Sequence, residues 1–220
     1  MQLLKKMNNQ ILNRSIIIEN QYFMNIDCIY NLFKFSNVEI EQYECYQKMS
    51  FRNRCVVAGA NGLIQLSVPL ENGRGQKCPV RDVRVNYAEA WQKQHWRTLF
   101  SCYGNAPFFE FYRDWLEAFY QKEFVFLFDM NMEALSWLKK VLKIPAEISL
   151  TNSFIKDYPT GIISDCRNRW LPKNYLDKPS PVRYRQVFAE GTGFMPNLSV
   201  LDMLFCAGPQ SNLLLQATDA

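Results

Sequence analysis

Two arginines separated by one residue, Arg52 and Arg54 in the stretch SFRNRC, form the first pattern with chemical meaning. If this stretch is extended, alternate residues project from one side, so both guanidinium groups can meet one phosphate through paired hydrogen bonds. Asn53 lies between them, and Phe51 can offer an apolar surface beside an anion. The pattern predicts an anion site, and an ordinary solvated face is the alternative.

A glycine-rich loop, ENGRGQK, follows about twenty residues later and adds Arg74 and Lys77. Its glycines permit close approach of the backbone, so the loop is a candidate cradle for a diphosphate, although it lacks P-loop spacing. A second stretch of the same kind, CRNRW at 166–170, is interpreted as loop charge unless the fold brings it close to the first.

Three glutamates, Glu39, Glu41 and Glu44, lie in and just after the alternating stretch NVEIEQYE. A solvated strand face is the default interpretation of such residues. The alternative is that Glu41 or Glu44 acts as a general base, because ligands gather at the carboxyl ends of strands in open α/β sheets. No His-x-His or Asp-x-Asp spacing accompanies them, so no metal site is predicted, and the sequence does not identify a cofactor.

The only histidine, His95, falls on the apolar face of a predicted helix together with Trp91, Leu99 and Cys102. One interpretation is a histidine at the edge of the core, bonded to a carbonyl group; the other is a residue that orients a substrate or relays a proton. Cys102 is about 10 Å away by helical rise, which excludes a direct thiolate–imidazole pair.

Composition limits the class of protein. The chain has 220 residues, 48% of them hydrophobic, and a net charge of +4, which is too small to indicate a nucleic-acid partner. Its seven cysteines show no C-x-x-C spacing, which favours reduced thiols in a cytoplasm. No apolar run approaches the ~20 residues that span a bilayer, and the first residues do not read as a signal peptide.

The hydrophobic pattern predicts a mixed α/β or α+β fold, with a β-rich N-terminal half that contains a hairpin, a helical middle and a sheet covered by helices. We expect a flexible extension over 1–14 and a single domain over 15–220. Strands are expected over 15–19, 37–44, 80–86 and 146–154, and a hairpin around Asn61–Gly62. Helices are expected over 26–35, 89–104, 108–123, 132–144 and 198–216, the last capped by Ser199, with mostly loop over 156–181.

Several stretches in order resemble the WbqC-like protein family: IEQYECYQKMSFRNRC, LSVPL, GRGQKCPVRDVRV, WQKQHWRTLFSCYGNAPFFEFY, FVFLFDMN and YRQVFAEGTGFMPNLSVLDMLFCAGP. The resemblance runs from about Ile16 to Pro209. It implies a cytoplasmic bacterial protein, of a kind often encoded beside genes for surface-polysaccharide or O-antigen assembly. It also implies a site role for the RNR arginines and for His95.

One segment departs from the family pattern. Where relatives carry a histidine and prolines, this chain has ENQYFMNIDCIY, which keeps Tyr22 and Phe23. If that histidine does chemistry elsewhere in the family, Glu19 or Asn20 would have to replace it here. Whether the segment from Glu19 to Ile26 supports activity is therefore open.

Two functions follow from these patterns. The first is a transferase that moves an acyl or aminoacyl group on a nucleotide- or phosphate-bearing sugar, with Glu41, Glu44 and His95 as catalytic residues. Its substrate-binding residues would be Tyr22, Arg52, Asn53, Arg54, Arg74 and Lys77. The alternative is a non-catalytic accessory or assembly protein of the same pathway.

Overall fold

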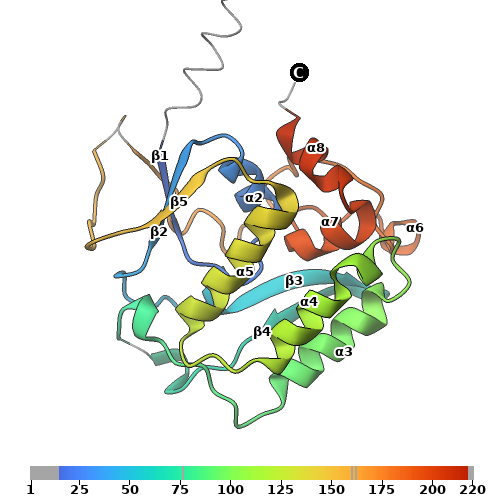
Figure 1. Cartoon of the computed structure of the whole chain (residues 1–220), viewed down its shortest axis with the longest axis horizontal. Helices are drawn as coiled ribbons and strands as arrows, with labels where there is room; N and C mark the ends of the chain where they lie inside the picture. Colours follow the sequence, from blue (N-terminus) through green and yellow to red (C-terminus); the bar gives the residue numbers. More distant parts are fainter. Residues whose placement is uncertain (1–14, 76, 160, 162, 218–220) are drawn as a thin grey trace, which may run out of the picture.

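Four parallel strands form the main sheet of the computed structural model, which describes residues 15–75, 77–159, 161 and 163–217 (Figure 1). The strands lie in the order β5-β2-β1-β6, so the first strand of the chain is flanked by the second and by the last. Their bounds are Ser15–Glu19 for β1, Asn37–Glu41 for β2, Glu147–Leu150 for β5 and Ile163–Asp165 for β6. The extension expected over 1–14 lies outside the described residues.

The two faces of this sheet differ in chemistry because side chains alternate along each strand. Ile16 and Ile18 of β1 pair in register with Val38 and Ile40 of β2, and all four belong to the hydrophobic core. The residues between and after them point the other way, and both strands end on that side in a glutamate. The alternation therefore places carboxylates at the carboxyl edge of the sheet, on the face away from the core.

The predicted hairpin is present. Strands β3 (Arg54–Gly59) and β4 (Gly62–Ser67) pair antiparallel through a short turn at Ala60 and Asn61. Gly62 has a φ of +115°, a conformation that glycine adopts without steric cost, which explains the Asn-Gly signal.

Seven α-helices are found in the described part of the chain. They are α2 (Ile26–Leu32), α3 (Trp91–Tyr103), α4 (Phe109–Gln121), α5 (Leu127–Leu142), α6 (Ala189–Thr192), α7 (Val200–Ala207) and α8 (Gln210–Gln216). Helices α3 and α4 lie side by side under the hairpin region in Figure 1. As predicted, the Ser199 hydroxyl caps α7 by accepting a hydrogen bond from the backbone N–H of Leu201.

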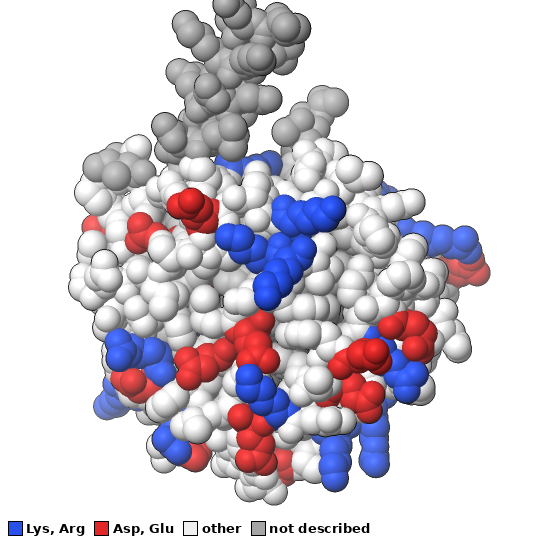
Figure 2. All heavy atoms as spheres, viewed as in Figure 1, with Lys and Arg blue, Asp and Glu red and all other residues white. Residues whose placement is uncertain are grey.

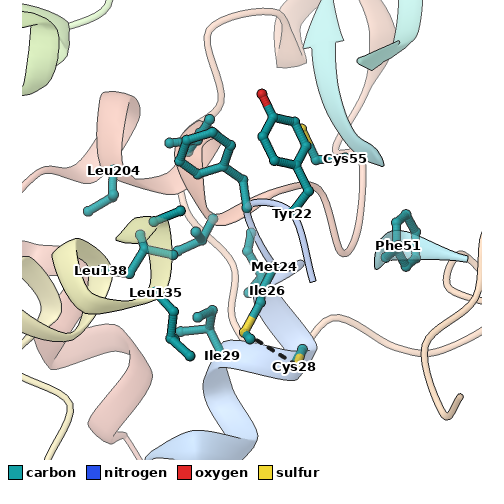
Figure 3. Close-up of a cluster of buried hydrophobic side chains, with 14 of the residues drawn as sticks. Tyr22, Met24, Ile26, Cys28, Ile29, Phe51, Cys55, Leu135, Leu138 and Leu204 are labelled. Atoms are coloured by element: carbon teal, nitrogen blue, oxygen red, sulfur yellow. Dashed lines mark hydrogen bonds between the residues drawn. The ribbon is translucent and has the colours of Figure 1, made fainter. Parts of the chain in front are cut away.

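The core joins the sheet to the helices. Figure 3 shows Met24, which precedes α2, and Ile26 and Ile29 of α2 gathered with Leu135 and Leu138 of α5. Leu204 of α7 lies in the same cluster, so residues far apart in the sequence close one hydrophobic interior. The fold class is the mixed α/β class that the hydrophobic pattern predicts.

Two local predictions were wrong, and one was incomplete. The strand expected over 80–86 is a 3₁₀ turn at Val80–Asp82, followed by single bridges rather than a ladder. The stretch 156–181 is mostly loop as expected, but it also contains the three-residue strand β6. The segment Phe51–Asn53 is a 3₁₀ turn and not extended, so Arg52 and Arg54 do not share a face.

Candidate functional site

The carboxyl edge of the sheet is the candidate site, and two glutamates define it. Glu19 and Glu41 are the last residues of β1 and β2, are partners in register, and have no exposed surface. Glu19 accepts hydrogen bonds from the side-chain amide of Gln21 (2.7 Å) and from the backbone N–H of Asn168 (2.8 Å). A buried carboxylate requires such hydrogen-bond donors, so the residues at this edge of the sheet are arranged to hold buried acidic groups.

Glu41 is held by a guanidinium from the other end of the chain. Arg167 Nη1 lies 3.3 Å from Glu41 Oε2, and its Nη2 lies 2.6 Å from Asp165 Oδ2. The same guanidinium lies over the rings of Phe154 and Tyr158, 5.3 and 5.1 Å from their centroids. The segment after β5 thus fixes Arg167 against the edge of the sheet.

Glu44 forms the third buried carboxylate, and its partner is Arg52. The guanidinium of Arg52, which has no exposed surface, donates to Glu44 Oε1 through both Nε and Nη2. Its Nη2 also donates to Asn168 Oδ1 (3.0 Å). Asn168 has a φ of +59°, a left-handed conformation that asparagine tolerates, and this turn aims its side chain at Arg52.

Burial raises the pKa of Glu44, and the Arg52 guanidinium opposes that rise. The negative charges of Glu19 and Glu41 raise the pKa of Glu44 further. A carboxyl group with a raised pKa that lines a cavity is a candidate for accepting and releasing a proton.

A cavity of about 430 Å³ opens on this cluster, and we refer to it as the carboxyl-edge cavity. Its position, beyond the carboxyl ends of parallel strands, is where open α/β sheets hold ligands. It combines aromatic, acidic and basic side chains: Tyr43, Glu44, Cys45, Tyr46, Gln47, Phe154, Lys156, Asp165, Arg167 and Asn168.

A second cavity of about 350 Å³ adjoins the first, because Tyr46 lines both. This basic cavity is lined by Lys48 and Arg54, together with Asn53, Gln65, Ser67, Val68, Pro69, Leu70 and Gly73. The Tyr46 hydroxyl donates to Asn53 Oδ1 (3.1 Å), and Asn53 Nδ2 donates to the carbonyl of Val68 (2.8 Å). Asn53 therefore fixes the position of Tyr46, the residue that separates the carboxyl-edge cavity from the basic cavity.

His95 lies elsewhere, in a buried chain of hydrogen bonds. Its Nδ1 is 3.1 Å from the Tyr22 hydroxyl, which is 2.7 Å from the Tyr120 hydroxyl. The ring also hydrogen-bonds to the backbone of Ser67, and burial lowers the pKa of His95 to about 4. The imidazole is neutral at physiological pH, and it hydrogen-bonds to the Tyr22 hydroxyl and to the backbone of Ser67. These contacts match the interpretation of His95 as a histidine at the edge of the core.

The structure brings together only part of the predicted site. Glu44 lines the carboxyl-edge cavity and is paired with the buried Arg52, while Glu41 is buried and paired with Arg167. Asn53 and Arg54 belong to the basic cavity, and Tyr22 and His95 line neither cavity. Lys77 is exposed and lines neither cavity, and the side chain of Arg74 lies outside the described residues.

Sequence reasoning missed Asp165, Arg167 and Asn168 as site residues. Their signal was the second RNR stretch, which repeats the residues of the first, and the structure places the leading arginine of each stretch in one cluster. Glu19, considered only as a substitute for a missing histidine, is the fourth carboxylate of that cluster.

Surface charge outside the cavities is mixed. Figure 2 shows that, on the face it presents, Lys and Arg side chains form small groups close to groups of Asp and Glu. Within the described residues no helix is both long enough and apolar enough to cross a bilayer. Because the positive and negative groups on the face in Figure 2 lie close together, a charged ligand can be recognised there only at sites a few side chains wide.

Comparison with known proteins gives the family. Residues 34–179, well over half of the chain, match the WbqC-like protein family. An uncharacterized protein of Mycobacterium tuberculosis is 25% identical over 190 residues, an alignment that covers 76% of this chain and 81% of the relative. No solved structure matches the chain. The matched range includes Glu44 and Arg167 of the carboxyl-edge cavity and Arg54 of the basic cavity, and the chain belongs to the WbqC-like protein family.

Proposed function

We propose that the protein is a cytoplasmic enzyme of bacterial surface-polysaccharide or O-antigen assembly, which transfers an acyl or aminoacyl group on an activated, phosphate-bearing sugar. Membership of the WbqC-like family supports a role in a biosynthetic pathway. One observation carries the proposal: the carboxyl-edge cavity, which contains Glu44, and the basic cavity, which contains Lys48 and Arg54, share Tyr46 as a wall.

The two cavities suit the two ends of such a substrate. The planar guanidinium of Arg54 and the ammonium of Lys48 are the side-chain types that bind phosphate oxygens. On the other side of Tyr46, carboxylates can accept hydrogen bonds from sugar hydroxyls, and the ring of Tyr46 offers a flat apolar surface. A nucleotide sugar or sugar phosphate would thus bind across Tyr46.

In this proposal Glu44 is the general base. It takes the proton of a sugar hydroxyl or amine as that group attacks the carbonyl carbon of an acyl donor, such as an acyl thioester. The new C–O or C–N bond forms, the bond to the donor's carrier breaks, and the carrier leaves with the electron pair. Arg52 positions Glu44 through its paired hydrogen bonds, and Glu41 fixes Arg167.

The test combines binding with turnover. Purified protein is screened by thermal unfolding against nucleotide sugars with and without acyl thioesters, and the expected result is a rise in Tm for phosphate-bearing sugars. Glu44→Gln should retain that rise and lose turnover by about 10²-fold or more, whereas Arg54→Gln should weaken the rise. Arg113→Gln, an exposed change on α4, is the matched control. No rise across the whole panel would contradict the proposal.

The alternative, a non-catalytic accessory protein, is favoured by exposed aromatic side chains on α3 and α4. Phe111 is 76% exposed and Phe100 is 46% exposed. Arg52 cannot contact a partner protein in that case, because it is completely buried. Loss of a co-purifying pathway enzyme in Phe111→Ser, with no loss in Glu44→Gln, would favour this alternative.

A further inference from the structure

The two edges of the β3–β4 hairpin differ. The outer edge of β3 is closed by neighbouring elements: the backbone N–H of Ser199 donates to the carbonyl of Val56 (2.7 Å), and the backbone N–H of Ala58 donates to the Tyr103 hydroxyl (2.8 Å). Strand β4, in contrast, pairs with β3 alone among the described residues. An unpaired strand edge is a template for pairing with another chain.

The register of the hairpin shows which backbone groups face the outer edge of β4. The backbone N–H of Val68 donates to the carbonyl of Asn53 (2.8 Å), so these two residues form a hydrogen-bonded pair. In an antiparallel ladder such pairs alternate with pairs whose N–H and C=O groups point outward. Leu63 and Gln65 belong to the second kind. Within the described part of the chain, the outward backbone groups of these two residues have no hydrogen-bond partner.

A groove of about 420 Å³ lies beside β4, and we refer to it as the β4–α3 groove. Its volume falls within the range of roughly 300–1,000 Å³ that is usual for ligand pockets. Ile64 lines the groove on the side of β4, and residues one helical turn apart on α3, namely Lys93, Arg97 and Ser101, line the opposite side. An exposed strand edge can bind an extended peptide through main-chain hydrogen bonds, while an adjoining pocket takes its alternate side chains.

The charged side chains of the β4–α3 groove are all positive. Lys93 and Arg97 line it, no acidic side chain does, and neither cation forms an ion pair with a described residue. The two residues are about 6 Å apart along the helix. Alternate residues of a strand, which project to the same face, are roughly 7 Å apart. A strand added to β4 would therefore bring two alternate side chains to the two cations.

We propose that the outer edge of β4 binds an extended acidic peptide of a partner protein as a third strand, with alternate carboxylates against Lys93 and Arg97. A second copy of the chain fits this edge less well, because β4 itself, GLIQLS, has no acidic residue to meet the cations. Ile64 lines the groove, whereas Gln65 and Ser67 line the basic cavity, and neighbouring residues of a strand point to opposite faces. Peptide binding is therefore independent of the proposed transferase activity.

The test titrates the full chain with short peptides and follows its backbone amide signals by NMR. The probe is acetyl-TETETE-amide. Its controls are acetyl-TTTEEE-amide, which lacks the alternation, acetyl-TQTQTQ-amide, which lacks the charge, and the probe N-methylated at every residue, which cannot donate to a strand. We expect the probe to bind about fivefold or more tightly than each control and to shift the amide signals of Leu63 and Gln65.

Two pairs of variants locate the binding. Lys93→Gln combined with Arg97→Gln should weaken binding of the probe about fivefold or more, whereas Arg185→Gln, at a side chain that is 89% exposed, should not change it. Leu63→Pro removes an outward N–H and leaves the ladder with β3 intact, so it should weaken binding by a similar factor. Leu63→Thr keeps that N–H and should bind as the unaltered chain does. If Leu63→Pro does not fold, the N-methylated peptide makes the same test.

Each other outcome overturns the proposal. Binding of acetyl-TTTEEE-amide or of the N-methylated peptide as tightly as the probe would show a site for anions without strand addition. Absence of binding by the probe would show that the edge of β4 does not accept an acidic strand. Self-association of the chain that Leu63→Pro abolishes would show that a second copy occupies this edge.

Discussion

Arg52 is a charged side chain with no contact with water, so its role in stability can be measured directly. Arg52→Met would leave the buried Glu44 without a cation, and the expected loss in free energy of unfolding is about 3–5 kcal/mol. Denaturant titration of both proteins gives the difference. Arg84→Met is the matched control, since its pair with Glu71 is exposed and should cost less than about 1 kcal/mol.

A double replacement separates loss of a pair from creation of an unpaired charge. Arg52→Met combined with Glu44→Leu removes both charges, and it should be more stable than Arg52→Met alone. A loss for Arg52→Met no larger than that for Arg84→Met would show that the carboxyl-edge cluster is not held as described.

At the scale of single residues, the sequence indicates chemistry but not its partners. Glu41, Glu44 and Arg52 were predicted as site residues from type and spacing; Glu44 and Arg52 form an ion pair, and Glu41 pairs with Arg167 instead. Arg54 was expected beside Arg52, but the 3₁₀ turn rotates it toward Gln65 and the basic cavity. Arg167 could not be placed beside Glu41 from the sequence, because the two residues are 126 positions apart and are brought together only by the pairing of distant strands.

At the scale of elements, the close contact between α7 and α4 depends on a glycine. Gly208 follows α7 with a φ of +53°, and a Cβ there would lie 2.4 Å from atoms of the Phe108 ring. The backbone N–H of Phe108 also donates to the carbonyl of Phe205 (3.0 Å), so the end of α7 and the start of α4 are joined at this point.

Gly208→Ala should therefore lower the free energy of unfolding by about 2–4 kcal/mol, through backbone strain and overlap with Phe108. Gly191→Ala is the control, because nothing lies within 4 Å of a Cβ at that position. Thermal and denaturant unfolding of the two variants measure the difference. Equal stability of the two variants would show that α7 can shift away from α4 without cost.

Elements with a clear period were predicted well, and short irregular ones were not. The apolar spacing of α3 and α4, and the alternation in β2, are local properties that the sequence displays. Strand β6 has only three residues, and it is stabilised by pairing with β1, which lies far from it in the sequence. The alternation over 80–86 resembled a strand, but the bridges of Val85 and Arg84 are isolated ones, to Leu70 and Phe126.

At the scale of the whole molecule, the order of the strands assembles the site. Because β1 lies between β2 and β6, the glutamate that ends the first strand meets the turn that follows the last one. The candidate site therefore draws on residues from Glu19 to Asn168 and exists only in the complete sheet. Sequence spacing alone could not reveal this arrangement, since the neighbours of β1 are set by tertiary packing.

The same closure makes stability depend on pH through His95, which joins α3 to Tyr22 after β1, to Tyr120 of α4 and to Ser67 of β4. Burial lowers the pKa of His95 to about 4 from its ordinary 6.5. Between pH 6.5 and pH 4, His95 is protonated in the unfolded chain but stays neutral in the folded chain. The stability that His95 contributes is therefore complete above pH 6.5 and is lost as the pH falls toward 4.

The full loss is about 3 kcal/mol, and about 2 kcal/mol of it falls between pH 7 and pH 5. Denaturant titration across this range should show the decline, and His95→Gln, which cannot take up a proton, should show a decline smaller by that amount. Glu44 acts in the opposite direction, because a carboxyl group with a raised pKa favours the folded state as the pH falls. The comparison of the two proteins cancels that contribution, so parallel pH profiles would mean that His95 is not buried as a neutral ring.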